Sequence, residues 1–151
     1  MPNFSNTTIL VTGGAGYIGS HIVSHLEACN ANVVIVDNLS TGHKDSVLYG
    51  TLIVEDLRNY DAISTIIADI KPDAVIHFAG SIVVPESVEN PWKYYQNNTS
   101  NSRQLMTLCH EHDVKHFLFS STAAVYGIPN GGTATETSPT QPINPYGRSK
   151  L

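Results

Sequence analysis

The sequence predicts an α/β domain built on a doubly wound parallel sheet, with helices covering both faces. Five short apolar runs alternate along the chain with stretches of helical spacing. Each run is apolar throughout, which is typical of strands buried on both faces of a parallel sheet. The chain has 151 residues, of which 41% are hydrophobic. It is therefore long enough for one domain with a core of its own.

The elements can be placed in chain order. Strands are expected at 9–11, 33–36, 52–54, 74–78 and 116–120. Apolar residues at helical intervals support one helix directly after the first strand and another from Asp61, which Pro72 ends. A longer helix is expected at 91–112, and a new helix begins at Pro145.

The segment 128–145 interrupts this pattern. It is rich in Gly, Thr and Pro and has almost no large apolar residues. A structureless segment of this length is usually functional or disordered. We expect a long surface loop, and the composition also fits a linker between domains.

Composition and charge exclude several classes of function. The chain carries 8 Lys and Arg against 13 Asp and Glu and has a net charge of −5. Without a dense basic run, a nucleic-acid partner is not expected. The apolar runs are far shorter than the roughly 20 residues that cross a bilayer. Residues 1–8 lack the basic and apolar parts of a secretory signal, so we expect a cytoplasmic protein without a membrane partner.

A glycine-rich turn follows the first strand, with Gly13, Gly16 and Gly19 in GxxGxxG spacing. The pyrophosphate of a dinucleotide must approach backbone N–H groups at a helix N-terminus, and a Cβ on the turn would block it. Glycine clusters also occur in ordinary turns. Here the cluster lies between an apolar strand and a helix, so dinucleotide binding is the better interpretation.

Asp37 lies 18 residues beyond Gly19, at the end of the second strand. A carboxylate at this place can accept both hydroxyls of an adenosine ribose, and it would repel a 2′-phosphate. No Arg follows at once, since the next residues are Asn38 and Leu39. The sequence therefore favours NAD over NADP, and the alternative role for Asp37 is a turn cap.

Tyr146 and Lys150 lie four residues apart, which places both on one face of a helix. An ammonium beside a phenol stabilises the phenolate, so that a tyrosine can accept a proton near neutral pH. Thr122 follows the fifth strand, at the edge where such folds bind their cofactors. Taken alone, the Tyr-Lys pair is also a common solvated arrangement, and the hydroxyl of Thr122 also fits an ordinary turn.

The histidines His21 and His25 have zinc-binding spacing but no third ligand, so no metal site is predicted.

Several further segments, taken with these motifs, resemble one family. They are Asp-Leu at 56–57, Phe-Ala-Gly at 78–80, Tyr-Gln-Asn-Asn at 95–98, FSSTAAVYG at 119–127 and Tyr-Gly-Arg-Ser-Lys at 146–150. Over essentially the whole chain they resemble the extended short-chain dehydrogenase/reductase family, whose fold is the Rossmann fold. DNLSTG at 37–42 and HFAGSIVVPESVENPWKYYQNN at 77–98 look most like its UDP-glucose 4-epimerase branch.

The resemblance implies a site for NAD along the carboxyl ends of the strands. The residues that would cradle the pyrophosphate are Gly13, Gly16, Tyr17, Ile18 and Gly19. Those that would line the adenosine ribose are Asp37, Asn38, Leu39, Ser40, Thr41 and Gly42. Asp56 would bind the adenine amino group, with Leu57 packed beside it. The strand end under the cofactor would be formed by Phe78, Ala79 and Gly80, with Asn97, Tyr146 and Lys150 as further contacts.

The same resemblance implies a reaction. Tyr146 would act as base on the sugar 4-hydroxyl, Thr122 would hydrogen-bond that oxygen, and Lys150 would support the tyrosine. UDP-glucose and UDP-galactose would interconvert through a 4-keto intermediate, as in galactose metabolism. Related dehydratases carry Asp-Glu where this chain has Ala123-Ala124, which argues against dehydration. Ile82 stands where well-known members place a lysine near the cofactor.

The resemblance also bears on the extent of the chain. Leu151 comes one residue after Lys150, within the first turns of a helix. We expect residues 1–151 to form an incomplete NAD-binding domain, which stops before the last strands and lacks the domain that binds the UDP-sugar. Members of the family form homodimers.

Two alternatives to a UDP-glucose 4-epimerase function are left open. One is a related sugar-nucleotide enzyme, and the other is a non-catalytic NAD-binding module.

Overall fold

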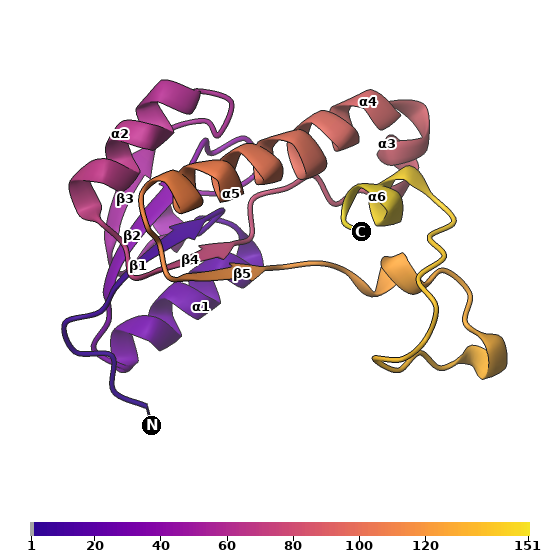
Figure 1. The fold of residues 1–151 in the computed structure, drawn as a ribbon, viewed down its shortest axis with the longest axis horizontal. Coiled ribbons are helices and arrows are strands. Elements are labelled where there is room, and N and C mark those ends of the chain that lie inside the picture. Colours follow the sequence, from indigo (N-terminus) through magenta and orange to yellow (C-terminus); the bar gives the residue numbers. More distant parts are fainter. Residues whose placement is uncertain (1) are drawn as a thin grey trace. The chain divides into compact units, whose positions relative to one another are not determined.

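The computed structural model describes residues 2–151, except for the side chain of Asn130. The chain forms two compact units. The first consists of residues up to 79 together with 103–120, and the second of residues 80–102 and 121–151. Figure 1 shows the course of the chain through both.

The first unit contains a five-stranded parallel sheet with the order β3-β2-β1-β4-β5. The strands are β1 (Thr8–Thr12), β2 (Asn32–Asp37), β3 (Thr51–Val54), β4 (Ala74–His77) and β5 (His116–Phe119). The chain moves outward from β1 to β3 and then returns to place β4 on the other side of β1. The carboxyl ends of β1 and β4 therefore flank a topological switch point, where sheets of this kind bind ligands.

Helices cover both faces of this sheet, as Figure 1 shows. They are α1 (Tyr17–Ala28) on one face, with α2 (Tyr60–Ile70) and the part of α5 (Asn101–Glu111) from Arg103 onward on the other. Neighbouring strand residues point to opposite faces. Leu10 packs with Ile63 and Leu105 of the second group, whereas Ile9 packs with Val23 of α1. The predicted doubly wound architecture is confirmed.

The two edge strands differ from the expectation that every strand is buried on both faces. In β3 Val54 is 57% exposed, and in β5 Leu118 is 61% exposed. The central strand β1 has no such residue, since Leu10 and Val11 are fully buried. An apolar run thus predicted the strands correctly, but it did not distinguish a central strand from an edge strand.

The second unit is built from short helices and loops. It contains α3 (Val84–Glu89), α4 (Pro91–Tyr94), a π-helical segment (Tyr95–Ser100), a 3-10 turn (Ala123–Tyr126) and α6 (Pro145–Ser149). Proline at the first turn and an asparagine cap start both α4 and α6, with the caps at Asn90 and Asn144. The helix expected at 91–112 is therefore present, but its middle is π-helical.

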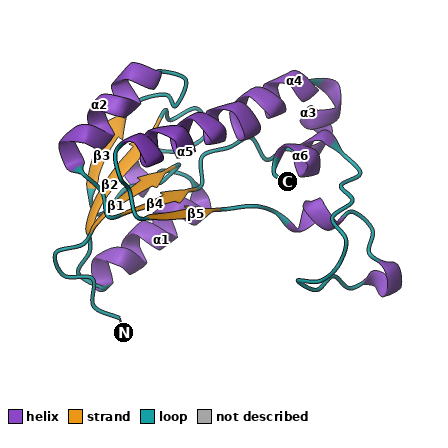
Figure 2. Cartoon of the chain, viewed as in Figure 1, coloured by secondary structure: helices purple, strands orange, loops and turns teal. Residues whose placement is uncertain are grey.

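The segment after the 3-10 turn is largely loop, as Figure 2 shows, and contains one short 3-10 helix (Asn130–Gly132). The described residues of 131–137 are all exposed, which confirms the predicted surface loop. Within residues 2–151, none of the helices has the length and apolar character that a membrane crossing would require.

Candidate functional site

The glycine turn between β1 and α1 is formed by tight backbone contacts of the first unit. Gly13 has φ +74°, and a Cβ on it would lie 2.5 Å from the backbone nitrogen of Ala79. A Cβ on Gly19 would collide with the carbonyl oxygen of Gly13. Both positions therefore require glycine for the fold itself, whatever the turn binds.

Gly16 differs from these two glycines. Its φ is −79°, which any residue adopts, and a Cβ there would meet a single atom, the carbonyl oxygen of Gly13, at 3.3 Å. Gly16 begins α1 without a side-chain cap, and the first turn of the helix carries no acidic residue. An uncapped helix N-terminus attracts an anion, and the missing Cβ leaves room for one. The next residues, Tyr17 and Ile18, are exposed.

Asp37 ends β2 beside this turn and is buried. One oxygen of its carboxylate accepts a hydrogen bond from the backbone N–H of Ala15 at 3.0 Å, and the other accepts one from Leu39 at 2.8 Å. Leu39 has φ +56°, an uncommon conformation for a residue with a side chain. The Asp37 carboxylate thus holds the loop 38–42 in place, and lone pairs remain on both oxygens for a ligand.

One further hydrogen bond lies within this loop, and another fixes its end to the glycine turn. The side-chain oxygen of Asn38 accepts from the N–H of Ser40 at 3.0 Å, and the N–H of His43 donates to the carbonyl of Ala15 at 3.1 Å. A Cβ on Gly42 would lie 2.9 Å from the backbone of Ala15. Thr41 lies exposed between these anchors. The loop predicted to surround a ribose is therefore ordered by the chain itself.

Asp56 follows β3 and accepts four hydrogen bonds. Arg58 donates three of them, from its backbone N–H, Nε and Nη2, each at 2.9 Å. The amide of Asn38 donates the fourth, at 2.8 Å. Chiefly because of the Arg58 side chain, the pKa of the Asp56 carboxyl lies far below its usual value. A carboxylate has about four acceptor positions, so a purine amino group would have to replace one of these donors. Sequence reasoning missed Arg58.

Two other predicted cofactor residues are part of the core of the first unit. Leu57 packs against the core on the α2 face, and Phe78 packs against the core on the α1 face. The N–H groups of Phe78 and Ala79 both donate to the carbonyl of Thr12, at 2.9 and 3.1 Å. These bonds bring the end of β4 alongside the glycine turn.

Gly80 and Lys150 lie together in the second unit. A Cβ on Gly80 would be 3.1 Å from Nζ of Lys150 and 3.0 Å from Oδ1 of Asn98. Lys150 is 4% exposed, and this burial lowers the pKa of its ammonium group to about 8. The hydroxyl of Ser121 donates to the backbone carbonyl of Lys150 at 2.9 Å.

Tyr146 and Thr122 are placed by contacts between α6 and the 3-10 turn. A Cβ on Gly147 would lie 2.6 Å from the carbonyl oxygen of Ala124, so glycine allows these two elements to meet. Thr122 accepts a hydrogen bond from the N–H of Ala124, which leaves its own proton for another acceptor. The ring of Tyr146 meets the buried ring of Tyr94 edge to face, with centroids 6.3 Å apart. The second unit thus contains all three predicted catalytic side chains.

Asn98 is a residue of this site that sequence reasoning missed. It is 1% exposed, and its amide binds both the N–H and the carbonyl of Ser81, at 2.7 and 2.9 Å. It also donates to the hydroxyl of Ser149 at 3.0 Å, and that hydroxyl donates to the carbonyl of Tyr146 at 2.8 Å. Asn98 therefore connects the segment after Gly80 with the helix that carries Tyr146 and Lys150. The Gln-Asn-Asn run at 96–98 was the available signal.

The low pKa of Lys150 predicts how stability depends on pH. The pKa of the ammonium is about 8 in the folded chain and near 10.5 in the unfolded chain. Folding therefore disfavours the charged form. Its burial cost is therefore fully present below pH 8 and is relieved as the pH rises toward 10.5. Between pH 7.5 and 9.5, we expect the unfolding free energy to rise by about 2 kcal/mol more in the unaltered chain than in Lys150→Met. Urea unfolding at both pH values measures this difference, and parallel pH profiles would contradict it.

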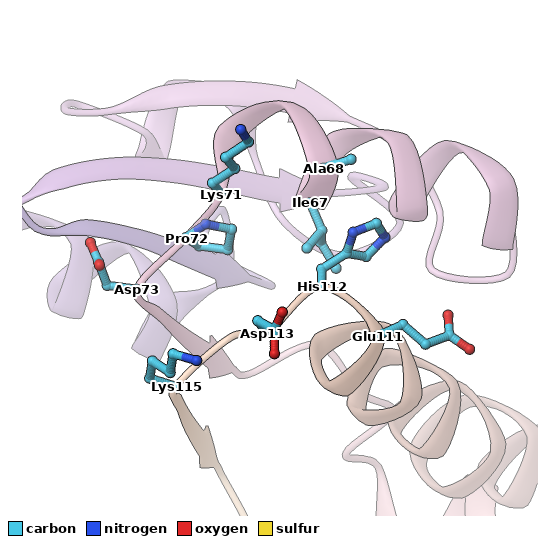
Figure 3. Close-up of a pocket in the computed structure, with 9 residues that line it drawn as sticks. All are labelled: Ile67, Ala68, Lys71, Pro72, Asp73, Glu111, His112, Asp113 and Lys115. Carbon is cyan, nitrogen blue, oxygen red and sulfur yellow. The ribbon is translucent and has the colours of Figure 1, made fainter.

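A hollow of about 480 Å³ lies at the opposite edge of the sheet, at the amino ends of β4 and β5 (Figure 3). Its lining consists of Ile67, Ala68, Lys71, Pro72, Asp73, Glu111, His112, Asp113 and Lys115. The lining mixes both signs of charge, so no single charge would select a ligand. Across residues 2–151, His, Cys, Asp and Glu side chains form no group of three able to hold a metal ion.

Comparison with known proteins agrees with this geometry. UDP-glucose 4-epimerase of Azospirillum brasilense is 48% identical over 144 residues, which is 95% of this chain and 41% of the relative. The structure of the UDP-Glc/GlcNAc 4-epimerase of Campylobacter jejuni matches with a TM-score of 0.93 and 43% identity, covering 96% of this chain and 46% of that one. UDP-glucose 4-epimerase of Brucella ovis, solved in complex with NAD, has a TM-score of 0.93 and 41% identity, covering 95% and 44%.

The chain thus spans less than half the length of the relatives that it matches. The family model described as the NAD dependent epimerase/dehydratase family matches residues 9–151. This match covers nearly the whole chain, from the first strand to the last residue. The chain therefore belongs to the NAD-dependent epimerase/dehydratase family.

Proposed function

We propose that the residues of this site bind NAD and serve the interconversion of UDP-glucose and UDP-galactose. The observation that carries the proposal is the glycine turn, where the uncapped start of α1 and the open side of Gly16 leave room for a pyrophosphate. Asp37 lies beside this turn with lone pairs available for the hydroxyls of a ribose. Relatives named as UDP-glucose 4-epimerases support the choice of reaction.

The residues present fit NAD. Gly13, Gly16 and Gly19, with the N–H groups of Tyr17 and Ile18, would hold the pyrophosphate, while Asp37 and the loop 38–42 would hold the adenosine ribose. The carboxylate of Asp37 would repel the 2′-phosphate of NADP. We therefore expect NADP to bind at least tenfold more weakly than NAD.

In this proposal, bound NAD would supply the hydride acceptor and hydride donor that inversion at sugar C4 requires. Tyr146, as phenolate, takes the proton of the 4-hydroxyl, and the hydroxyl of Thr122 donates a hydrogen bond to the same oxygen. Lys150 favours the phenolate through its charge and holds the nicotinamide ribose. Burial keeps water away from this ammonium, which strengthens its effect on the phenolate.

Two alternatives follow from particular observations. The Campylobacter jejuni relative acts on UDP-Glc and UDP-GlcNAc, so a different sugar nucleotide is one of them. The other is a module that binds NAD without turnover, for which the glycine turn and Asp37 are sufficient. We also propose a dimer, from the resemblance to the family, and a cytoplasmic location, from the sequence.

Two measurements on the purified protein test the proposal. Equilibrium binding of NAD and NADP tests the cofactor, and interconversion of UDP-galactose and UDP-glucose tests the reaction. Where turnover is found, Tyr146→Phe is expected to lower it by about 100-fold or more, because proton transfer is lost, while NAD affinity changes little. Tight NAD binding without turnover would favour the module, and an unaffected rate in Tyr146→Phe would exclude this tyrosine as the base.

A further inference from the structure

The asparagines Asn97 and Asn98 both bind Ser81, and together they contact each of its polar atoms. Asn98 pairs with its backbone N–H and carbonyl, as described above. Asn97 donates from Nδ2 to the Ser81 hydroxyl oxygen at 3.0 Å. The hydroxyl therefore accepts a hydrogen bond from the chain, and its own proton stays available to a further acceptor.

The amide of Asn97 is itself one member of a relay. Gln96 donates to the side-chain oxygen of Asn101 at 3.2 Å, and Asn101 donates to that of Asn97, also at 3.2 Å. The π-helical segment makes this relay possible, because its wider turn brings residues five apart, such as Gln96 and Asn101, onto the same side. Successive hydrogen bonds with the same direction polarise one another. The three amides of Gln96, Asn101 and Asn97 thus form a chain of donors that ends at the hydroxyl of Ser81.

The position of Ser81 indicates which ligand this donor meets. Ser81 follows Gly80, whose missing Cβ leaves room for Nζ of Lys150. In the proposed function, Lys150 holds the nicotinamide ribose. Ile82, the next residue, is 68% exposed and offers no donor from its side chain. A neutral hydroxyl is thus the side-chain donor that residues 80–82 offer next to the ammonium.

We propose that the Ser81 hydroxyl is a cofactor-binding donor, directed by the amide relay toward an oxygen of the nicotinamide riboside half of NAD. The inference rests on the proposed function. The amide of Asn97 donates to Ser81 and accepts from Asn101, and its second N–H is available for the cofactor contact that the sequence predicts for this residue.

The test compares NAD with ADP, which carries the adenosine half alone. Ser81→Ala is expected to weaken NAD binding about five- to tenfold, the usual effect of losing one hydrogen bond, and to leave ADP binding unchanged. Ser81→Thr keeps the hydroxyl and should bind NAD within about twofold of the unaltered chain. Ser138→Ala, which removes a hydroxyl in the exposed loop, is the matched control.

Asn97→Asp tests the relay itself. A carboxylate only accepts hydrogen bonds, so it would take the proton of Ser81 for itself. NAD affinity should fall as in Ser81→Ala, and the effect of Asn97→Asp should be smaller once Ser81 is already alanine.

Unchanged NAD affinity in Ser81→Ala would overturn the inference, as would an equal loss of ADP affinity, since this would indicate a general defect of the fold. If the unaltered chain binds ADP but not NAD, the inference fails and the adenosine site stands. If it binds neither, the proposed function fails, and the inference fails with it.

Discussion

Gly13→Ala is expected to unfold the first unit. The substitution combines a backbone at φ +74° with a Cβ placed 2.5 Å from a backbone nitrogen of the neighbouring strand end. Neither atom can move without breaking the bonds between Thr12 and residues 78–79. We expect a loss on the order of 4 kcal/mol or more, which is most of the stability of an ordinary domain. Urea unfolding followed by circular dichroism measures it.

Gly16→Ala is the matched control for this prediction. Its backbone is extended, and the added methyl group meets one oxygen at 3.3 Å. The cost in stability should be about 1 kcal/mol or less, the usual difference between Gly and Ala at a helix start. NAD affinity should nevertheless fall at least tenfold, because the methyl group fills the space proposed for the pyrophosphate. A stable Gly13→Ala protein, or a Gly16→Ala protein with unchanged NAD affinity, would contradict the account of the turn.

Asn98→Ala is expected to release the segment after Gly80 and loosen α6. The substitution leaves the N–H and the carbonyl of Ser81 without their partner and removes the donor to Ser149. Unpaired buried polar groups cost about 1–3 kcal/mol each, so we expect a loss of about 3 kcal/mol in the second unit. Near-ultraviolet circular dichroism follows the unfolding of this unit through its buried tyrosine, Tyr94.

Asn97→Ala provides the comparison for Asn98→Ala, because Asn97 is less buried and bonds a hydroxyl instead of a backbone. Its cost should be about 1 kcal/mol. Hydrogen exchange offers a second measurement, since the Ser81 N–H should lose its protection in Asn98→Ala and keep most of it in Asn97→Ala. Equal protection in the two variants would contradict the role of Asn98.

The strands were predictable because each is a continuous apolar run between turn residues. The predicted and observed limits differ by one residue at most ends, as at β4, which ends at His77 instead of Phe78. The π-helical segment was not predictable, because its spacing is set by contacts with Ser81 and Ser149 and not by an apolar period. Burial of the edge strands depends on which strands become neighbours, and no local pattern contains that information.

The chemistry-bearing residues were easier to predict than the residues that hold them. Tyr146 and Lys150 lie four apart, so their relation is visible in the sequence. Asn98 lies 51 residues from Ser149, and only the fold brings them together. Arg58 illustrates a different limit, since a residue two positions from Asp56 can pair with it only where the turn after β3 brings the two side chains together. Motifs thus identify groups that meet ligands, and long-range contacts identify their supports.

Neutral groups make the hydrogen bonds that join Ser81 and Ser121 to the segment 96–101 and to residues 149–150. They are the amides of Gln96, Asn97, Asn98 and Asn101 and the hydroxyls of Ser81, Ser121 and Ser149. Dissolved ions screen interactions between charges and leave such hydrogen bonds largely unaffected. A phosphate held at the start of α1 depends on charge and dipole, and it is therefore sensitive to salt. Rising ionic strength should therefore weaken the binding of a phosphate at the start of α1, while the hydrogen bonds of this polar framework in the second unit stay largely unchanged.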